Sequence, residues 1–538
     1  MTEALRPFSY GHGGLGVCLI ALVGWYWADR RRKTEVLLPW LYAAVCASMI
    51  TELLLTTWYL YCPAFLDHIE ASVVSNVHYL LAGRPLYPSL DSYSFSGLLY
   101  GPLLAELNAL GYVVLGDSFC AKLTGWLAGW GAVAVLITLS WRAGRGTASL
   151  AALTYALAFL FSLGAGFTAG RAEPLLLLFA ACSLAVALNL KGLSGLTVLG
   201  LLCGAAMGLK AHAALYIVPS LFVWGSGRSL QQWRQEWKIL TVGFGGAVLI
   251  ALVLPFLPQN VSAAGYFRYL TLAAKHGLSL DLFGRNCAFL LGLWAPILLL
   301  AGGFQPLRPA SRTWLGFALT LLGSECIVLV VASKPGAGIH HFIPFLAPHV
   351  LLFQDLYGFT PAAGGFTPAA RGRAALALTA AVLGMITPTF QTFGSLIAFD
   401  LGRTEQVRER DELLEFALRF PRGMLGVGDD TSYPLANLRP WLTARGVSQT
   451  DYGAFMDLEL SGVTDEPLRS AFSRCAIPFV YVPRPGPPFT LNSNYRAHPL
   501  FSDTLRHEFA IRYARVQAGV YFDVFACQPE PEHHTGVP

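Results

Sequence analysis

Residues 37–61, LLPWLYAAVCASMITELLLTTWYLY, form an apolar run that is followed at once by CPAFLDHIEASVVSNVHYLL at 62–81. The first stretch is long enough to cross a membrane as a helix, which takes about 20 mostly apolar residues. Comparable runs recur at roughly 13–28, 119–140, 148–168, 174–190, 193–209, 213–227, 239–257, 287–302, 314–332, 342–356 and 373–392. Their number predicts a polytopic α-helical membrane protein with about 11–13 transmembrane helices.

The composition of the 538-residue chain agrees with a place in a membrane. Only 13% of the residues are charged and 54% are hydrophobic, and the mean hydropathy is +0.52. A soluble fold needs a charged exterior, and about 25% of its residues are charged on average. The net charge of +5 comes mostly from Lys and Arg in short loops. There is no basic groove, so nucleic acid is not an expected partner.

The loops between the apolar runs alternate in charge. Basic residues gather in every second loop, at Arg30–Lys33, Arg142 with Arg145, Lys191, Arg228 with Arg234 and Lys238, Arg308 with Arg312, and Arg371 with Arg373. The positive-inside rule places these loops in the cytoplasm. It places the other loops outside, at about 63–118, 169–173, 210–212, 258–286 and 333–341, together with the C-terminal part.

The chain changes character near residue 393, where ordinary charge and short β-branched runs begin. We expect 1–392 to form the transmembrane domain, with surface helices in its outer loop 63–118, and 393–538 to form a small soluble α/β domain outside. Its first helix is expected to begin near Arg408, and its strands are expected at about 424–427, 477–482 and 519–525. Cys475 and Cys527 lie in this domain and can pair if it faces an oxidising compartment.

The first outer loop begins with two acidic residues, Asp67 and Glu70. A helix over 66–81 places Leu66, Ile69, Val73, Val77 and Leu80 on one side. This pattern predicts an amphipathic helix that rests on the bilayer and ends at Gly83. The two acids are three residues apart, so they share a face of the helix. Spacing alone leaves open whether this is a solvated helix face, favoured by the helix dipole, or a pair of acids used in chemistry.

Several short motifs follow the acids on the same predicted side of the membrane. They are Gly83-Arg84-Pro85-Leu86-Tyr87, Tyr100-Gly101-Pro102, Ala169-Gly170-Arg171-Ala172-Glu173-Pro174, and 333–344, SKPGAGIHHFIP. With Asp67-His68-Ile69-Glu70 before them, this order resembles the GT-C superfamily, polytopic glycosyltransferases that take sugars from polyprenyl-phosphate carriers. His68 stands where many members carry a second acid, so it stays open whether Asp67 acts alone or with Glu70.

The resemblance implies an inverting displacement at the anomeric carbon of a sugar. Asp67 is the predicted base for the acceptor hydroxyl, and Glu70 orients the acceptor or replaces Asp67. The departing lipid phosphate needs cations and hydrogen-bond donors more than a general acid. Predicted substrate-binding residues in the outer turns and matched motifs are Arg84, Tyr100, Arg171, Glu173, Lys210, His212, Lys334, His340 and His341. For the basic ones, the alternative is contact with lipid headgroups.

The resemblance also implies partners and a location. The donor would be a polyprenyl-phosphate-linked sugar, the acceptor a glycan, lipid or protein, and membrane lipids would surround the helices. The expected location is a bacterial inner membrane, with the active site outside the cytoplasm. No cofactor is certain. A divalent cation bound by Asp67, Glu70 and the phosphate stays open, and metal ligands are unknown.

Two other classes of function stay open beside the transferase. A transporter or flippase of lipid-linked sugars would also have about twelve spans and a few intramembrane acids, such as Glu52 and Glu325. These acids either border a cavity or form hydrogen bonds between helices. A non-catalytic membrane scaffold would not depend on Asp67. The chain has no convincing internal repeat but has a long outer loop and an outer domain, which favours the transferase.

Overall fold

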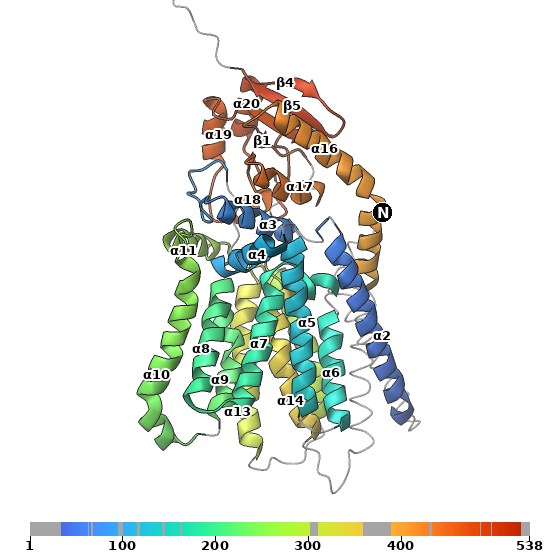
Figure 1. Cartoon of the computed structure of the whole chain (residues 1–538), viewed down its shortest axis with the longest axis vertical. Coiled ribbons are helices and arrows are strands. Elements are labelled where there is room, and N and C mark those ends of the chain that lie inside the picture. Colours follow the sequence, from blue (N-terminus) through green and yellow to red (C-terminus); the bar gives the residue numbers. More distant parts are fainter. Residues whose placement is uncertain are drawn as a thin grey trace, which may run out of the picture. The chain divides into compact units, whose positions relative to one another are not determined.

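The computed structural model describes residues 34–62, 64–65, 68–94, 100–115, 119–142, 146–161, 164–226, 228–301, 310–358, 389–429, 433–484, 486–495 and 498–528 (Figure 1). The chain divides into two compact units. The helical unit comprises Met1–Tyr61, Lys122–Pro255 and Leu278–Ile397, and the α/β unit comprises Cys62–Ala121, Phe256–Gly277 and Ala398–Pro538. The predicted span 13–28, most of the span 373–392, and Asp67 lie outside the described residues.

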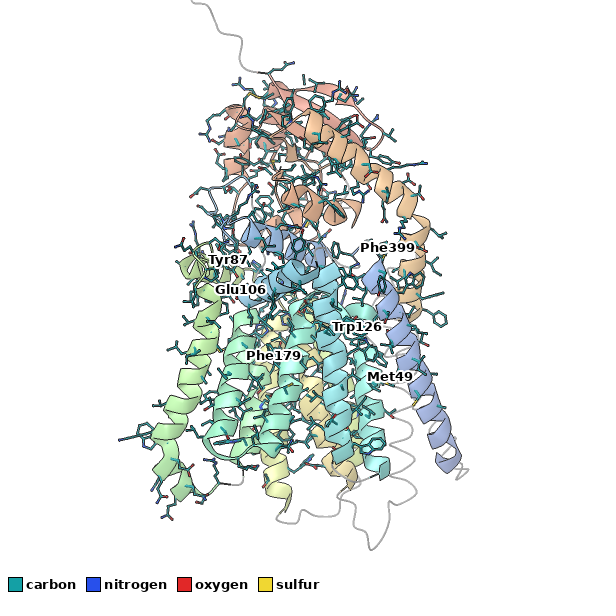
Figure 2. All side chains as sticks on the ribbon, in the orientation of Figure 1. Met49, Tyr87, Glu106, Trp126, Phe179 and Phe399 are labelled. Atoms are coloured by element: carbon teal, nitrogen blue, oxygen red, sulfur yellow. A yellow bond between two sulfur atoms is a disulfide. The ribbon has the colours of Figure 1, made fainter. Side chains whose placement is uncertain are left out.

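The helical unit consists of long apolar helices and short 3-10 segments. In chain order they are α2 (Thr34–Tyr61), α5 (Phe119–Arg142), α6 (Gly146–Phe161), η2 (Gly164–Thr168), α7 (Ala172–Asn189), α8 (Gly192–Leu209), η3 (Ala213–Tyr216), α9 (Val218–Gly225), α10 (Leu230–Val253), η4 (Leu254–Phe256), α12 (Leu280–Ala301), α13 (Ala310–Ala332), η5 (Ile339–Phe345) and α14 (Leu346–Gly358). Most of the side chains on these helices are apolar, and Figure 2 labels Met49 on α2 and Phe179 on α7 as examples.

Five helices in the described part of the chain are long and apolar enough to cross a membrane. They are Ala121–Trp141, Ala172–Asn189, Gly192–Leu209, Arg234–Phe256 and Thr313–Ala332. Leu249 and Ile250 on α10 are 61% and 64% exposed, as expected of side chains that face lipid. The chain is therefore an integral membrane protein.

Two predicted spans are broken into shorter elements. The run 213–227 forms η3 and the eight-residue helix α9, which begins beside Pro219. The run 342–356 forms the end of η5, which contains Pro344, and the 13-residue helix α14. Proline removes a backbone donor and clashes with the preceding turn, so it divides an apolar run that hydropathy alone treats as one helix.

Helices α8 and α10 pack closely because α8 presents glycines to its neighbour. A Cβ atom added at Gly200 would lie 2.6 Å from the Phe244 carbonyl oxygen, and one at Gly204 would lie 2.3 Å from the Val248 carbonyl oxygen. Small residues four apart let two membrane helices approach until their backbones touch. This contact fixes α8, whose C-terminal end carries Lys210.

The α/β unit combines three helices from Cys62–Ala121 and Phe256–Gly277 with the C-terminal fold. The loop helices are α3 (His68–Leu81), α4 (Pro102–Leu115) and α11 (Ala263–Ala273). The C-terminal elements are α16 (Arg403–Arg419), β1 (Met424–Leu425), α17 (Tyr433–Ala444), β2 (Ser448–Gln449), α18 (Tyr452–Glu459), α19 (Glu466–Ser473), β3 (Phe479–Pro483), α20 (Asp503–Arg512), β4 (Tyr513–Ala518) and β5 (Phe522–Cys527).

The strands form one mixed sheet in the order β2-β1-β3-β5-β4. Strand β1 is parallel to β2 and β3, whereas β5 is antiparallel to β3 and β4. Buried aromatic rings fill the core, and Phe472 packs against Phe489, Phe509 and Tyr513. A disulfide joins Cys475 to Cys527, so the pairing that the sequence left open is present in the structure.

Candidate functional site

A cluster of charged and polar side chains forms at one end of the helical unit. Arg171 and Glu173 lie where α7 begins, and Lys210 lies where α8 ends. Because α7 and α8 are consecutive helices joined by a short turn, the start of one and the end of the other come to the same end of the bundle. Residues His340 and His341 join them from η5.

Glu173 is the centre of this cluster and is 2% exposed. Its Oε1 atom lies 2.5 Å from Lys210 Nζ and 3.7 Å from His340 Nε2. Its Oε2 atom lies 3.3 Å from Arg171 Nε. A buried carboxylate is costly without partners, and here it holds two cations and an imidazole in fixed positions around itself.

Two further histidines extend the cluster. The Nδ1 atom of His341 lies 3.2 Å from Nε2 of His212, which in turn lies 3.2 Å from the hydroxyl of Tyr216. Burial, with the nearby Lys210, lowers the pKa of His212 to about 3 and the pKa of His341 well below its usual value. Both rings are therefore neutral at physiological pH and offer hydrogen bonds without charge.

The cluster is accessible at Arg171 and His340, whose side chains are 15% and 24% exposed. The guanidinium Nη2 atom of Arg171 lies 3.4 Å from His340 Nε2. Lys334 is near enough to lower the pKa of His212 through its charge. Arg171 and Lys210 around the single Glu173 carboxylate, with Lys334 near His212, leave a surplus of positive charge. Arg has the fork geometry that matches phosphate oxygens.

The predicted site residues of the 63–118 loop belong to the α/β unit, and the structure describes only some of them. Glu70 lies in the first turn of α3 and is fully buried. The predicted lipid-facing side of α3 is also buried by protein, since Val73 and Val77 are 1% and 0% exposed. The prediction of an amphipathic helix resting on the bilayer is therefore wrong, because protein covers α3 on both sides.

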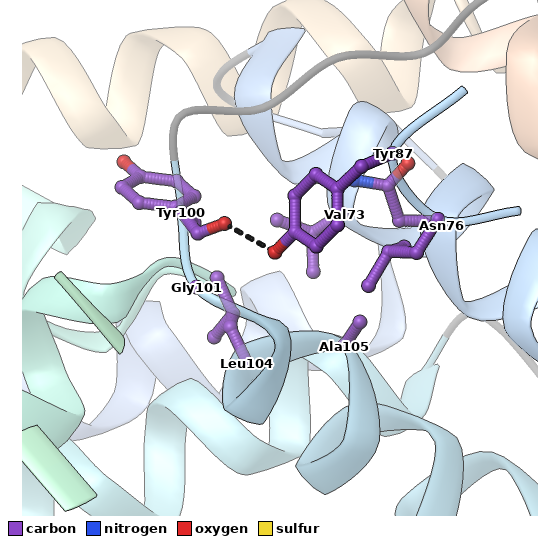
Figure 3. A pocket seen from close by; sticks show the side chains of 8 residues that line it. Val73, Asn76, Tyr87, Tyr100, Gly101, Leu104 and Ala105 are labelled. Carbon is purple, nitrogen blue, oxygen red and sulfur yellow. Dashed lines mark hydrogen bonds between the residues drawn. The ribbon is translucent and has the colours of Figure 1, made fainter. Parts of the chain in front are cut away.

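Tyr100 and Arg84 help to shape the loop that follows α3. The hydroxyl of Tyr87 donates to the Tyr100 carbonyl oxygen at 2.8 Å, beside a small pocket lined by Val73, Asn76, Leu86, Tyr87, Tyr100, Gly101, Leu104 and Ala105 (Figure 3). The carbonyl oxygen of Arg84 accepts from Asn260 Nδ2 at 3.1 Å. Gly83 ends the helix with a φ of 66°, a backbone conformation that favours glycine.

Comparison with known proteins bears on the fold. No family profile and no curated protein sequence matches the chain. The solved structure of ArnT from Cupriavidus metallidurans bound to undecaprenyl phosphate aligns with 91% of this chain and 99% of its own length, with a TM-score of 0.53 and 13% identity. The chain has an ArnT-like fold. The apo state of ArnT aligns over the same shares, with a TM-score of 0.48 and 13% identity.

ArnT is a GT-C glycosyltransferase. The predicted fold class is confirmed for this chain, which is a mostly helical membrane protein with an ArnT-like fold and a small C-terminal mixed sheet. At 13% identity the likeness to ArnT concerns the fold and leaves residue roles to the geometry. Among the described residues, no three His, Cys, Asp or Glu side chains form a group that could bind a metal ion. Asp67, the acid proposed as a ligand, is not among them.

The two intramembrane acids take part in hydrogen bonds within the ArnT-like helical unit. The Oε2 atom of Glu325 accepts from Trp294 Nε1 at 2.6 Å, and its Oε1 atom lies 2.6 Å from His349 Nε2. The Oε1 atom of Glu52 accepts from Thr389 Oγ1 at 2.5 Å. Of the two explanations that the sequence left open, the structure supports hydrogen bonds between helices.

Sequence reasoning missed Tyr216 and the pair Arg439 and Asp451. Tyr216 follows His212 by four residues, so helical spacing could have indicated that the two side chains meet. Arg439 and Asp451 form a buried ion pair in the C-terminal segment, with 2.7 Å between Nη1 and Oδ1. Nothing in the local sequence marks them, because their meeting depends on the tertiary packing of α17 and α18.

Proposed function

We propose that this chain is a membrane glycosyltransferase that moves a sugar from a polyprenyl-phosphate carrier to an acceptor. The cluster around Glu173 carries the proposal, because it gathers Arg171, Lys210 and His340 at the end of membrane helices. The ArnT-like fold supports it, since one ArnT structure was solved with undecaprenyl phosphate bound.

The chemistry of the cluster suits a lipid phosphate. Arg171 and His340 are the partly exposed members and would contact the phosphate oxygens, with Lys334 adding charge. Lys210 and Glu173 lie beneath them and would hold this arrangement before the donor binds. Preorganised cations stabilise the negative charge that grows on a departing phosphate, and they need no rearrangement during the reaction.

The proposed reaction exchanges one bond for another at the anomeric carbon. The bond from that carbon to the phosphate oxygen breaks, and its electron pair leaves with the polyprenyl phosphate. The acceptor oxygen forms the new bond and loses its proton to a carboxylate. We assign Asp67 as that base and Glu70 as the residue that orients the acceptor or replaces it. A glycan, lipid or protein could supply the hydroxyl.

The proposal includes a location. The basic residue Arg142 is the last residue of α5, and Lys191 and Arg228 follow the ends of α7 and α9. The turn holding Lys191 is at the opposite end of α7 from the cluster. By the positive-inside rule, the cluster would then face away from the cytoplasm. The disulfide between Cys475 and Cys527 is consistent with an oxidising compartment. A bacterial inner membrane fits these features.

The test is sugar transfer by the purified protein in nanodiscs. Radiolabelled polyprenyl-phosphate sugars would be supplied with a membrane and glycan extract, and wild type compared with Asp67→Asn and Arg171→Ala. Arg285→Ala is the matched control, because Arg285 is an exposed arginine of the same unit and forms an ion pair with Asp281, one turn before it on α12. We expect transfer to be lost with Asp67→Asn and to fall at least about tenfold with Arg171→Ala.

Each other outcome has a definite meaning. If no donor loses its sugar to any acceptor, the transferase proposal is wrong and transport or scaffolding becomes the better explanation. If transfer occurs but does not depend on Asp67, the assignment of the base is wrong. If Arg171→Ala and Arg285→Ala behave alike, the cluster is not the phosphate site.

A further inference from the structure

A buried polar triangle joins helix α3 to the C-terminal segment within the α/β unit. The Nη1 atom of Arg439 donates to Asp451 Oδ1 at 2.7 Å and to Ser72 Oγ at 3.0 Å. The hydroxyl of Ser72 donates to Asp451 Oδ2 at 2.6 Å. All three side chains are at most 2% exposed. Each of these hydrogen bonds therefore forms in a region of low dielectric, where it is stronger than it would be in water.

Arg439 and Asp451 are themselves held rigidly by their own segment. The guanidinium carbon of Arg439 lies 4.4 Å from the centre of the Tyr452 ring. The Oδ1 atom of Asp451 accepts from the Ala454 backbone N–H at 3.1 Å and so caps helix α18. Ser72 thus binds to a carboxylate whose position is already fixed by an arginine and by a helix N-terminus.

The same strip of the C-terminal segment also binds the loop after α3. The hydroxyl of Ser94 donates to the Gln449 carbonyl oxygen at 3.2 Å, and the hydroxyl of Thr450 donates to the Tyr93 carbonyl oxygen at 2.8 Å. Residues 439–452 therefore bind the 63–118 loop at two places, at Ser72 on α3 and at Tyr93 and Ser94. Polar bonds of this kind fix one register, which apolar packing alone does not.

Because Ser72 lies on α3, the hydrogen bonds of Ser72 with Arg439 and Asp451 constrain the rotation of that helix. Ser72 and Glu70 are two residues apart on α3, so their side chains point roughly 200° apart around the helix axis. Binding Ser72 on one side of α3 fixes the rotation of the helix about its axis. That rotation sets the direction of the fully buried Glu70 carboxylate on the other side.

We propose that Arg439 and Asp451 are positioning residues for the transfer reaction, which act through Ser72 to hold the acidic helix α3 in its productive rotation. This inference rests on the proposed function and gives the C-terminal segment a role in it. A buried ion pair adds little net stability compared with apolar residues, so its benefit here is geometric. Groups that act in catalysis must be held within a fraction of an ångström.

Ser72→Ala is the sharpest test, since it removes the connection and leaves the ion pair intact. The matched control is Ser75→Ala, because Ser75 is equally buried on α3 but its hydroxyl donates to the Ala71 carbonyl oxygen of its own helix. We expect Ser72→Ala to lower kcat by about 10- to 100-fold, as small misplacements of catalytic groups do. The KM for the polyprenyl-phosphate sugar should stay within about twofold of wild type.

Asp451→Asn gives a second measurement, because the amide keeps the shape of the side chain and loses its charge. We expect the same loss of kcat and faster hydrogen exchange in peptides from 68–81. An active wild type with unchanged kcat per folded molecule in both variants would overturn the positioning role alone, whatever their melting temperatures. A wild type that transfers no sugar from any donor would overturn the proposed function and this inference together.

Discussion

The cluster at the end of the helical unit makes a quantitative prediction about Glu173. Its carboxylate is 2% exposed and is the shared counterion of Lys210, Arg171 and His340, at 2.5, 3.3 and 3.7 Å. Removing one member of a buried ion pair costs about 3–5 kcal/mol, because the remaining charge stays buried without compensation. The amide of Glu173→Gln still accepts a hydrogen bond from Lys210, so we expect a loss at the low end, about 3 kcal/mol.

A double-mutant cycle separates this ion pair from general damage. Lys210→Met alone should cost about 2–3 kcal/mol, since Glu173 keeps its other two partners. The double variant Glu173→Gln with Lys210→Met should cost only about 3–4 kcal/mol, which gives a coupling energy of about 2 kcal/mol. The assay is the free energy of unfolding, measured by circular dichroism as a mild detergent is replaced with sodium dodecyl sulfate. Costs that add to within about 0.5 kcal/mol would refute the reasoning.

Two further predictions concern the C-terminal fold. Replacing both Cys475 and Cys527 with serine opens a loop with a sequence separation of 52. The double substitution should lower the free energy of unfolding by about 4 kcal/mol. The variant should melt at a lower temperature than wild type, and added reductant should not lower its melting temperature further. Burial, with the neighbouring Glu405 and Glu412, raises the pKa of Glu409 from 4.5 to about 7. The folded state therefore binds a proton in this window that the unfolded state has lost, so the melting temperature should fall as pH rises from about 4.5 to about 7. Glu409→Gln should flatten this part of the profile.

Much of the helical unit could be predicted because lipid imposes a simple rule on sequence. The predicted spans 174–190, 193–209 and 314–332 match Ala172–Asn189, Gly192–Leu209 and Thr313–Ala332 to within a few residues. Each is a mostly apolar run with polar or charged residues near its ends, although the third also contains Glu325. Hydropathy could not show that Pro219 and Pro344 lie where runs break into shorter helices.

The C-terminal fold was less predictable because its strands are short and partly exposed. The buried strand β3 was expected at 477–482 and lies at Phe479–Pro483. Strand β2 has two residues and no periodicity, and the edge strand β4 is largely exposed, so neither has a clear hydrophobic pattern. The sequence also did not show that protein buries α3 on both sides. That burial comes from tertiary contacts, which the local sequence pattern does not reveal.

For the candidate site, topology carried more information than motif. Arg171, Lys210 and His340 are far apart in sequence. All three lie at ends of apolar runs that the alternation of charge assigns to one side of the membrane. The structure brings these three together around Glu173. Sequence could not indicate that Glu173 would be the buried centre, since burial depends on how α7, α8 and η5 pack.

The central claim is that the cluster around Glu173 binds the phosphate of a polyprenyl carrier. Native mass spectrometry of the purified protein titrated with undecaprenyl phosphate tests it most directly. The account predicts one bound lipid on wild type and on Arg285→Ala, and a Kd at least about tenfold higher for Arg171→Ala, because a charge-assisted hydrogen bond to phosphate is lost. Equal affinity in all three proteins would contradict it.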